Sequence, residues 1–397
     1  MSRRSGALAL LPALLFAVPL AGAEEEETWL ERAERRSLER EAEGLAEPFR
    51  GIRIDGEIER GLFPLRSTGV STEPVRAAAL AFLASLTAVQ RDATTFPVDD
   101  PEWRRWMNQH FYQGRGTSFA DMSNAQRDAA LGLLRAALSA KGLELTRDIM
   151  RLNHTLGELN DDNFVEFGEW LYRITVMGEP SVTEPWGFKL NGHHLVINYF
   201  VLGDQVVMSP AFFGSEPVRA REGRFAGTEI LQREESWGRG FLWGLDEAQR
   251  AAAVIAATKD GNNNVGEAFS DNLDLERAGL RATALDAAQR TELLELIALY
   301  VGNMDDGHAA VKMAEVEAHL DDTWFTWIGG TGVDAVFYYR ILSPVILIEF
   351  DHQRPANLRH LYPPVPNREH IHTVIRTPNG NDYGRDLLRQ HLEAHPH

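Results

Sequence analysis

Cysteine is absent from all 397 residues of the sequence. This absence excludes disulfide bonds, thiol nucleophiles and iron–sulfur clusters held by cysteine. A metal site in this chain must therefore use imidazoles, carboxylates, or backbone and amide oxygens as its ligands. The 13 histidines are consequently the main candidates for metal ligands.

Long hydrophobic runs are missing from most of the chain. The runs at 196–202 and 345–350 are far shorter than the roughly 20 residues that a membrane-spanning helix needs. We therefore expect no integral membrane domain.

The exception lies at the start of the chain. Arg3 and Arg4 precede an apolar stretch at 7–20 that two prolines interrupt, and Ala21-Gly22-Ala23 follows it. These parts predict a cleavable secretory signal at residues 1–23, and hence a periplasmic or secreted protein. An uncleaved membrane anchor is the alternative interpretation.

Basic residues are also scarce. Lysine and arginine number 40 against 58 aspartates and glutamates, which gives a net charge of −18. Nucleic-acid binding is not expected, because neutralising phosphates requires clustered basic side chains. The sequence contains no G-x-G-x-x-G after a predicted strand, no Walker A motif and no G-x-S-x-G motif, so dinucleotide, P-loop and serine-hydrolase sites are not indicated.

Four segments share a pattern that is typical of a helix start. Thr87, Ser123, Asp246 and Asp286 each follow an apolar residue and precede a Gln-Arg pair whose glutamine lies three residues on. This spacing predicts an N-cap residue with a capping box. Two copies lie before residue 150 and two after 240, which leaves two interpretations open: an internal duplication of a helical pair, or four independent helices.

The predicted helices and strands are partly segregated along the chain. Helices are expected at 24–46, 74–86, 87–92, 123–141, 161–171, 246–259, 286–302, 308–320 and 385–392. Strands are expected at 195–200, 205–208, 336–340, 345–351 and 370–376, with hairpin turns between neighbours. The pattern indicates the α+β class, with a mixed, largely antiparallel sheet flanked by capped helices.

The same pattern suggests how the chain is divided. Residues 24–69 form a charged helix and linker after the signal, and residues 70–397 form one large α+β domain.

The clearest candidate site is His370-Ile371-His372-Thr373-Val374-Ile375-Arg376. In a strand, His370, His372 and Arg376 point to the same face. Two imidazoles on one face form a platform for a metal ion, and the arginine can bind an anionic group beside it. A polar face of hydrogen-bonded histidines is the structural alternative.

A second candidate is the end of the apolar run at 345–352, where Glu349, Asp351 and His352 follow buried residues. A carboxylate there can bind a metal, orient a histidine or act as a general base. Arg340, on the preceding strand, is a further candidate for binding an anion.

The third candidate is the pair His193-His194 after Gly192. Adjacent residues of a strand face opposite ways, so at most one of the pair is expected to share a site with the other histidines, unless Gly192 marks a bulge. His194 is preferred because it shares a face with Asn198.

Several of these segments together resemble the bacterial and fungal DUF3500 family, over about residues 70–395. They are Gly192-His193-His194-Leu195, Ser209-Pro210-Ala211-Phe212-Phe213-Gly214, Tyr338-Tyr339-Arg340-Ile341, Leu347-Ile348-Glu349-Phe350-Asp351-His352 and the block from His370 to Gly384. The resemblance implies that the histidine-rich segments belong to a recurring family pattern. It implies no particular activity, substrate or catalytic residue.

Three functional hypotheses follow. The first is an exported enzyme that uses a divalent zinc, copper or iron ion on a small anionic substrate, with hydrolysis favoured over oxidation. Its metal ligands would be drawn from His193, His194, His352, His370 and His372, and its catalytic residues from Glu349, Asp351, Arg340 and Arg376. The second is a non-catalytic protein that binds a small ligand or a metal. The third is a metal-free hydrolase with His372 as base and Glu349 as its partner.

Overall fold

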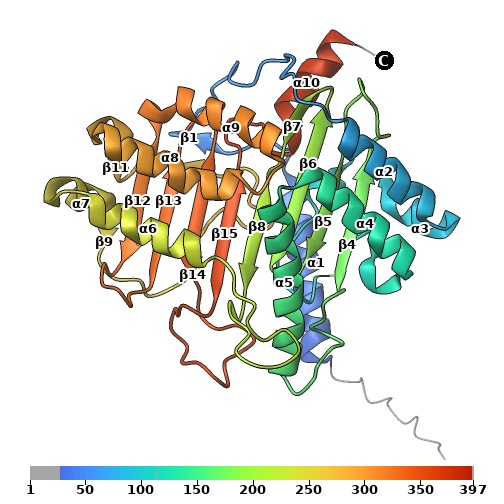
Figure 1. Ribbon diagram of the computed structural model, residues 1–397, viewed down its shortest axis with the longest axis horizontal. Coiled ribbons are helices and arrows are strands. Elements are labelled where there is room, and N and C mark those ends of the chain that lie inside the picture. Colours follow the sequence, from blue (N-terminus) through green and yellow to red (C-terminus); the bar gives the residue numbers. More distant parts are fainter. Residues whose placement is uncertain (1–26, 113, 396–397) are drawn as a thin grey trace, which may run out of the picture.

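The computed structural model describes residues 27–112 and 114–395 (Figure 1). The predicted secretory signal at residues 1–23 lies outside this part of the chain. Most of the described strands form one 13-stranded mixed, mainly antiparallel sheet, and β1 and β10 form a separate parallel pair. The α+β class and the mixed, largely antiparallel sheet predicted from the sequence are thereby confirmed.

The main sheet has the strand order β11-β12-β13-β14-β15-β8-β6-β5-β4-β2. Three short strands lie off this path: β3 pairs with β4, β7 with β6 and β9 with β12. The strands are β1 (Arg53–Ile54), β2 (Thr95–Phe96), β3 (Thr117–Ser118), β4 (Tyr172–Met177), β5 (Trp186–Gly192), β6 (Leu195–Leu202), β7 (Gln205–Val207), β8 (Ala211–Ser215), β9 (Val254–Ala256), β10 (Asp274–Leu275), β11 (Leu280–Arg281), β12 (Trp324–Gly329), β13 (Phe337–Leu342), β14 (Leu347–His352) and β15 (Ile371–Arg376).

The helices are α1 (Trp29–Ala46), α2 (Glu73–Ser85), α3 (Ala88–Thr94), α4 (Asn124–Ala137), α5 (Ala140–Glu158), α6 (Gln232–Gly244), α7 (Glu247–Ala253), α8 (Ala287–Val301), α9 (Asp306–Ala318) and α10 (Arg385–Ala394). All four predicted helix starts carry the expected capping boxes, at Thr87, Ser123, Asp246 and Asp286.

The chain contains a structural repeat. The series α2, α3, β2, β3, α4, α5, β4, β5, β6 and β8 recurs as α6, α7, β9, β11, α8, α9, β12, β13, β14 and β15, with the same strand pairings. The capping glutamines also pair within each repeat: Gln126 donates to Gln90 at 2.7 Å, and Gln249 donates to Gln289 at 2.9 Å. Of the two interpretations left open by the sequence, the structure therefore supports the duplication.

The two repeats join at the centre of the sheet. β8 of the first repeat pairs antiparallel with β15 of the second, from Ala211 opposite Ile375 to Ser215 opposite Ile371. This pair of strands, called the seam below, makes the sheet continuous across the whole domain.

The two faces of the sheet are covered differently. In Figure 1, α6, α8 and α9 lie in front of β12–β15 and α4 and α5 in front of β4–β6, whereas α1 lies behind the sheet. Apolar side chains such as Phe350 and Tyr339 form stacked aromatic contacts in the core. Burying such side chains between helices and sheet is the main stabilising contribution to a domain of this size.

The other face is polar and is covered by two long connections. The described residues of the first are 97–112 and 114–116, and the second comprises residues 257–279. Lys189 in β5 donates to the carboxylate of Glu102 in the first connection at 2.7 Å. Glu349 in β14 accepts the backbone N–H of Gly266 in the second at 2.8 Å. Each connection follows the short parallel strand of its repeat, so the duplication brings both onto the same face.

Some sequence predictions were wrong. Residues 161–171 form turns rather than a helix, and the helix predicted at 123–141 ends at Ala137. Helices α5 and α6 and strands β4 and β12 were not predicted. The apolar patterns of the two strands are short, and such patterns do not distinguish a helix from a strand. The amphipathic pattern of α5, with Leu145, Ile149, Leu152 and Leu156 buried on one face, was a usable signal that the prediction missed.

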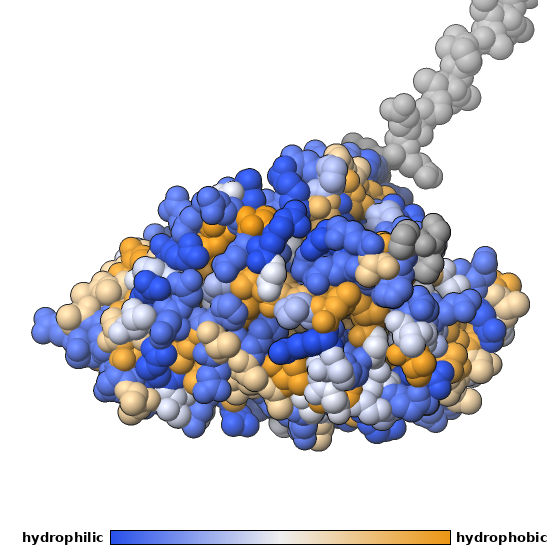
Figure 2. All heavy atoms as spheres, turned by 90° about the horizontal axis from the view of Figure 1, so that it is seen from above, coloured by the Kyte–Doolittle hydropathy of each residue, from blue (hydrophilic) through white to orange (hydrophobic). Residues whose placement is uncertain are grey.

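Within the described part of the chain, no helix combines the length and the hydropathy needed to cross a membrane. The face seen in Figure 2 is mostly hydrophilic, with small groups of hydrophobic residues between the polar ones.

Candidate metal centre

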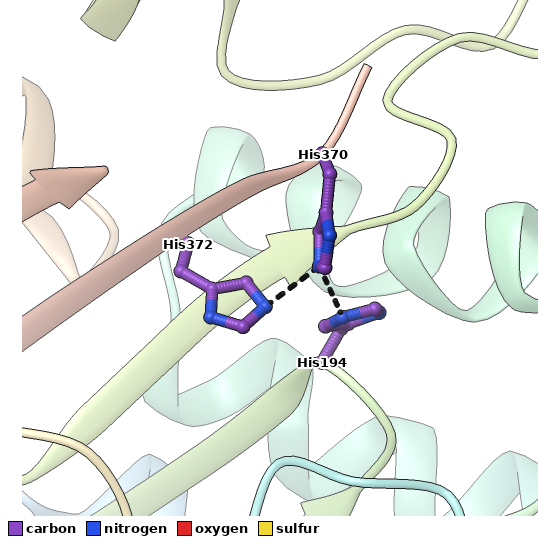
Figure 3. Close-up of side chains that lie close together, drawn as sticks. All are labelled: His194, His370 and His372. Carbon is purple, nitrogen blue, oxygen red and sulfur yellow. Dashed lines mark hydrogen bonds between the residues drawn. The ribbon is translucent and has the colours of Figure 1, made fainter. Parts of the chain in front are cut away.

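Three histidines meet on the polar face of the sheet and are called the histidine triad: His194, His370 and His372 (Figure 3). The Nε2 atom of His370 lies 2.9 Å from that of His372 and 3.3 Å from that of His194. The three residues are buried, at 5%, 3% and 6% exposed for His194, His370 and His372.

Both repeats contribute to the histidine triad. His372 is the second residue of β15, and His370 immediately precedes that strand. His194 belongs to the two-residue turn between β5 and β6 and has a positive φ of 59°. Its backbone N–H donates to the carbonyl of Asn108, and its carbonyl accepts from Gly214 in β8. The triad therefore lies at one end of the seam.

The outer nitrogen of two of these rings is fixed by an acceptor. Nδ1 of His370 lies 2.7 Å from the carbonyl oxygen of Arg354, and Nδ1 of His372 lies 2.5 Å from the carboxylate of Glu267. Because a carbonyl oxygen only accepts, Nδ1 of His370 must carry the hydrogen, and Nδ1 of His372 carries it when Glu267 is ionised. The Nε2 lone pairs of two neutral rings then face each other, and this arrangement needs a cation or a proton between them.

The triad geometry fits a metal ion. Zinc–nitrogen bonds of about 2.0–2.1 Å in a tetrahedral site place the ligand nitrogens about 3.3 Å apart. The Nε2 separations of 3.3 and 2.9 Å are within a few tenths of an ångström of that value. The His194, His370 and His372 group can therefore hold a metal ion.

Burial also favours the uncharged rings that metal binding requires. Desolvation lowers the pKa of His194 and His372 well below its usual value, and the neighbouring histidines add to the effect. Burial raises the pKa of Glu267 to about 7, although a hydrogen bond from Asn264 opposes the shift. The pocket around the triad thus disfavours extra protons on the imidazoles and a bare charge on the carboxylate.

Glu267 is held by both of the long connections. Asn264, three residues earlier, donates to its carboxylate, and Asn108 from the first connection also forms a side-chain hydrogen bond with it. Through Asn108 and Glu267 the two connections meet above the triad. The contact of Glu267 with Nδ1 fixes the orientation of the His372 ring and leaves Nε2 facing the triad. Residues that hydrogen-bond to metal ligands do the same in metalloproteins.

The other predicted histidines lie apart from the three Nε2 atoms. His193 stacks on His194, with ring centroids 4.0 Å apart, and its Nδ1 lies 2.7 Å from Asn153. His352 accepts the backbone N–H of Phe337 at 3.0 Å, on the opposite face of β14 from Asp351. The preference for His194 over His193 agrees with this geometry, although both occupy a turn and not a strand.

Glu349 and Asp351 bind the second connection and not the triad. Glu349 accepts the hydroxyl of Tyr338 at 2.7 Å and the backbone N–H of Val265 at 3.0 Å. Asp351 forms a buried ion pair with Lys259. These carboxylates anchor the connection that carries Glu267, and the carboxylate beside His372 is accordingly not Glu349.

The two predicted arginines also contact protein groups. Arg376 is fully buried and donates to Asp382 at 2.8 Å, to Asp271 at 2.7 Å and to the carbonyl of Gly266 at 2.9 Å. Arg340 donates to the carbonyl of Glu276 at 3.0 Å. Arg376 therefore joins the second connection to the turn that follows β15.

Sequence reasoning did not identify Glu267, Asn264 or Asn108. The available signal was the run Gly261-Asn262-Asn263-Asn264, whose composition is typical of a tight loop. The position of that loop over β15 depends on contacts between residues about 100 positions apart, such as that of Glu267 with His372. No local pattern encodes such a contact.

A cavity of about 160 Å³ begins beside the triad at His193. Its lining includes His110, Glu166, Asn153 and, from α1, Leu30. Nε2 of His110 lies 3.2 Å from the carboxylate of Glu166. The cavity therefore offers a small space of mixed polarity, and His193, which stacks on His194, separates it from the triad.

No curated protein and no solved structure shows significant similarity to this sequence. The sequence model of a family described as "Protein of unknown function (DUF3500)" matches residues 68–385, which is most of the chain, and the protein therefore belongs to the DUF3500 family.

Proposed function

We propose that the protein is an exported, metal-dependent enzyme that hydrolyses a small anionic substrate. The observation that carries the proposal is the convergence of three Nε2 atoms: those of His194 and His372 lie 3.3 and 2.9 Å from that of His370, and Nδ1 of His370 and of His372 each face a fixed oxygen atom. Three imidazole ligands with one further position open are the usual protein contribution to a catalytic zinc site.

A divalent ion at this place would lower the pKa of a bound water to about 7 and so supply hydroxide at neutral pH. Zinc suits a site of imidazoles without thiolates. Copper or non-haem iron on the same ligands would instead support oxidation, which is the alternative chemistry for this centre.

The residues of the chain would bind the ion, orient its ligands and hold the substrate. His194, His370 and His372 would hold the ion, Glu267 orients His372, and the carbonyl of Arg354 orients His370. The 160 Å³ cavity beside His193 would hold the substrate, and its size restricts the substrate to a small molecule.

A non-catalytic metal or ligand carrier is the second candidate. The observation in its favour is the deep burial of all three imidazoles, which suits retention of an ion. The metal-free hydrolase has less support, because Glu349 is bound to Tyr338 and Val265 and does not contact His372 in the structure.

Metal content tests the proposal. The protein would be purified without an affinity tag and analysed by mass spectrometry beside His194→Ala, His370→Ala and His372→Ala. We expect about one equivalent of metal in the wild type and a large loss in each variant. His360→Ala, at an exposed histidine outside the triad, is the control and should keep the metal.

Two results would contradict the proposal. Sub-stoichiometric metal in the wild type, after growth with zinc, copper and iron supplied, would rule out a metal centre at the triad. A stoichiometric metal with no turnover of esters, phosphates or amides, and no water in its coordination shell, would favour the carrier.

Export is tested separately. N-terminal sequencing of the protein from the periplasm or the medium should find Glu24 as the first residue. An intact Met1 in the cytoplasmic fraction would contradict export.

A further inference from the structure

An arginine-rich cleft lies apart from the residues of the histidine triad. It has a volume of about 1050 Å³ and is formed by residues 49–60, the turn at 379–380 and α10, which lies beside the C-terminus at the top of Figure 1. Six arginines line it: Arg50, Arg53, Arg60, Arg104, Arg385 and Arg389. Such a concentration is notable in a chain with a net charge of −18.

Four of these arginines have carboxylate partners. Arg104 pairs with Asp271 at 2.7 Å and is buried, so it belongs to the core of the domain. Arg50, Arg53 and Arg389 form more exposed pairs, with Glu47, Asp274 and Asp386 respectively. Pairs of that exposure are weak and can exchange one carboxylate for another.

Arg385 has no such partner among the described residues. Its hydrogen bonds go to the backbone carbonyls of Asp99 and Asp100 at 3.4–3.5 Å, and its Nε is buried without a partner. Burial lowers the pKa of its guanidinium. The carboxylates of Asp99 and Asp271 attract the guanidinium without contacting it. A desolvated cation without a direct carboxylate contact is unfavourable, and a bound anion would relieve that cost.

The position of Arg385 adds to the argument. It is the first residue of α10, where the helix dipole disfavours a positive charge. A long cationic side chain is therefore placed where both burial and the helix oppose it, and it lines the cleft.

Arg60 provides a second available guanidinium. It is exposed, and the structure describes no hydrogen bond or ion pair for its side chain. Arg385 and Arg60 thus come from opposite ends of the sequence and line the same cleft, which suits a ligand with more than one anionic group.

The other residues that line the cleft favour some classes of anion over others. Asp99, Asp386 and Glu393 would repel a densely charged polymer such as polyphosphate, but they can accept hydrogen bonds from hydroxyl groups. Phe49 and Leu388 supply apolar surface for the C–H face of a ring. Separated carboxylates, many hydroxyls and apolar ring faces together describe an acidic oligosaccharide.

We propose that this cleft binds a short acidic oligosaccharide, with Arg385 and Arg60 holding two of its carboxylates. The site is separate from the proposed metal centre. Arg50, Arg53 and Arg60 precede the family match at 68–385 and Arg389 follows it, so four of the six arginines in the cleft lie outside the match.

Isothermal titration calorimetry of the purified chain tests the proposal. The probes are a hexamer of galacturonate, a neutral glucose hexamer and inorganic polyphosphate. We expect the galacturonate hexamer to bind, with an affinity that falls as salt is added, and the neutral hexamer to show no binding.

Arg60→Gln and Arg385→Gln identify the site. Each should weaken galacturonate binding by about tenfold to a hundredfold, because each removes a charged hydrogen-bond donor. Arg233→Gln, at an exposed arginine of α6 outside the cleft lining, is the matched control and should bind as the wild type does.

Several outcomes would overturn the proposal. They are no binding of the acidic hexamer, equal binding of the neutral hexamer, tighter binding of polyphosphate, or unchanged affinity in Arg60→Gln. If Arg385→Gln fails to fold, Arg60→Gln alone tests the proposal. Replacing the exposed Arg60 disturbs no described contact, so this variant should fold.

Discussion

The carboxylate of Glu267 lies 2.5 Å from Nδ1 of His372, although 105 residues separate them in the sequence. This contact links the connection that follows β9 to the strand at the centre of the sheet. It orients one imidazole of the triad, and it identifies Glu267 as the first residue outside the triad to substitute.

Glu267→Gln should weaken metal binding by about tenfold to a hundredfold while the fold is retained. The amide can still accept from His372 but lacks the charge that makes the ring a stronger ligand. The measurement is competition with a chromogenic chelator. Glu166→Gln, in the wall of the neighbouring cavity, is the control and should bind metal normally. Equal metal affinity in wild type and Glu267→Gln would rule out this role.

Metal should stabilise the folded protein. An ion at 100 times its dissociation constant adds about 2.7 kcal/mol to the free energy of unfolding, provided that the unfolded chain does not bind it. Differential scanning calorimetry should therefore show a higher Tm with zinc than with a chelator. The difference should vanish in His194→Ala, and an equal zinc effect in that variant would place the ion elsewhere.

Asp351→Asn should lower the free energy of unfolding by about 3–5 kcal/mol, because it leaves Lys259 buried without its counter-charge. The double variant Asp351→Leu with Lys259→Met should be less destabilised than that. Urea unfolding measures both. Asp274→Asn breaks the half-exposed pair with Arg53 and should cost less than about 1 kcal/mol. Similar losses in the two single variants would contradict the burial argument.

Stability should fall in acid partly through His352. Burial lowers the pKa of this histidine to about 3, whereas an unfolded chain has a value near 6.5. The unfolded state therefore binds the proton first as pH falls. The stabilising contribution is complete above about pH 6.5 and is lost towards pH 3, by about 1.4 kcal/mol per pH unit.

His352→Gln should consequently flatten the dependence of unfolding free energy on pH between 6.5 and 4.5. Urea unfolding at a series of pH values measures this slope. His360→Gln, at an exposed position, should keep the wild-type slope. An unchanged slope in His352→Gln would show that His352 does not contribute to the acid sensitivity.

Local patterns predicted the parts of the fold that local physics determines. The capping boxes at Thr87, Ser123, Asp246 and Asp286 need only four consecutive residues, and all four are present. His370 and His372 were predicted to share a face because side chains alternate along a strand, and their Nε2 atoms are 2.9 Å apart.

Long-range geometry limited the prediction of the site. The strand alternation used for His193 and His194 fails because these residues form a turn, where the backbone of His194 adopts a positive φ. Glu349 and Asp351 were predicted at the end of a buried strand, and both lie in β14. What covers these carboxylates could not be inferred, because the covering residues 263–266 are more than 80 positions away in the sequence.

The triad occupies one end of the seam between β8 and β15, and the hydroxyls of Ser209 and Thr377, 2.7 Å apart, lie beyond the opposite end. The histidine triad takes His194 from the first repeat and His370 and His372 from the second. The two ends of the seam therefore carry different chemistry, and a single repeat expressed alone should be unable to assemble the triad.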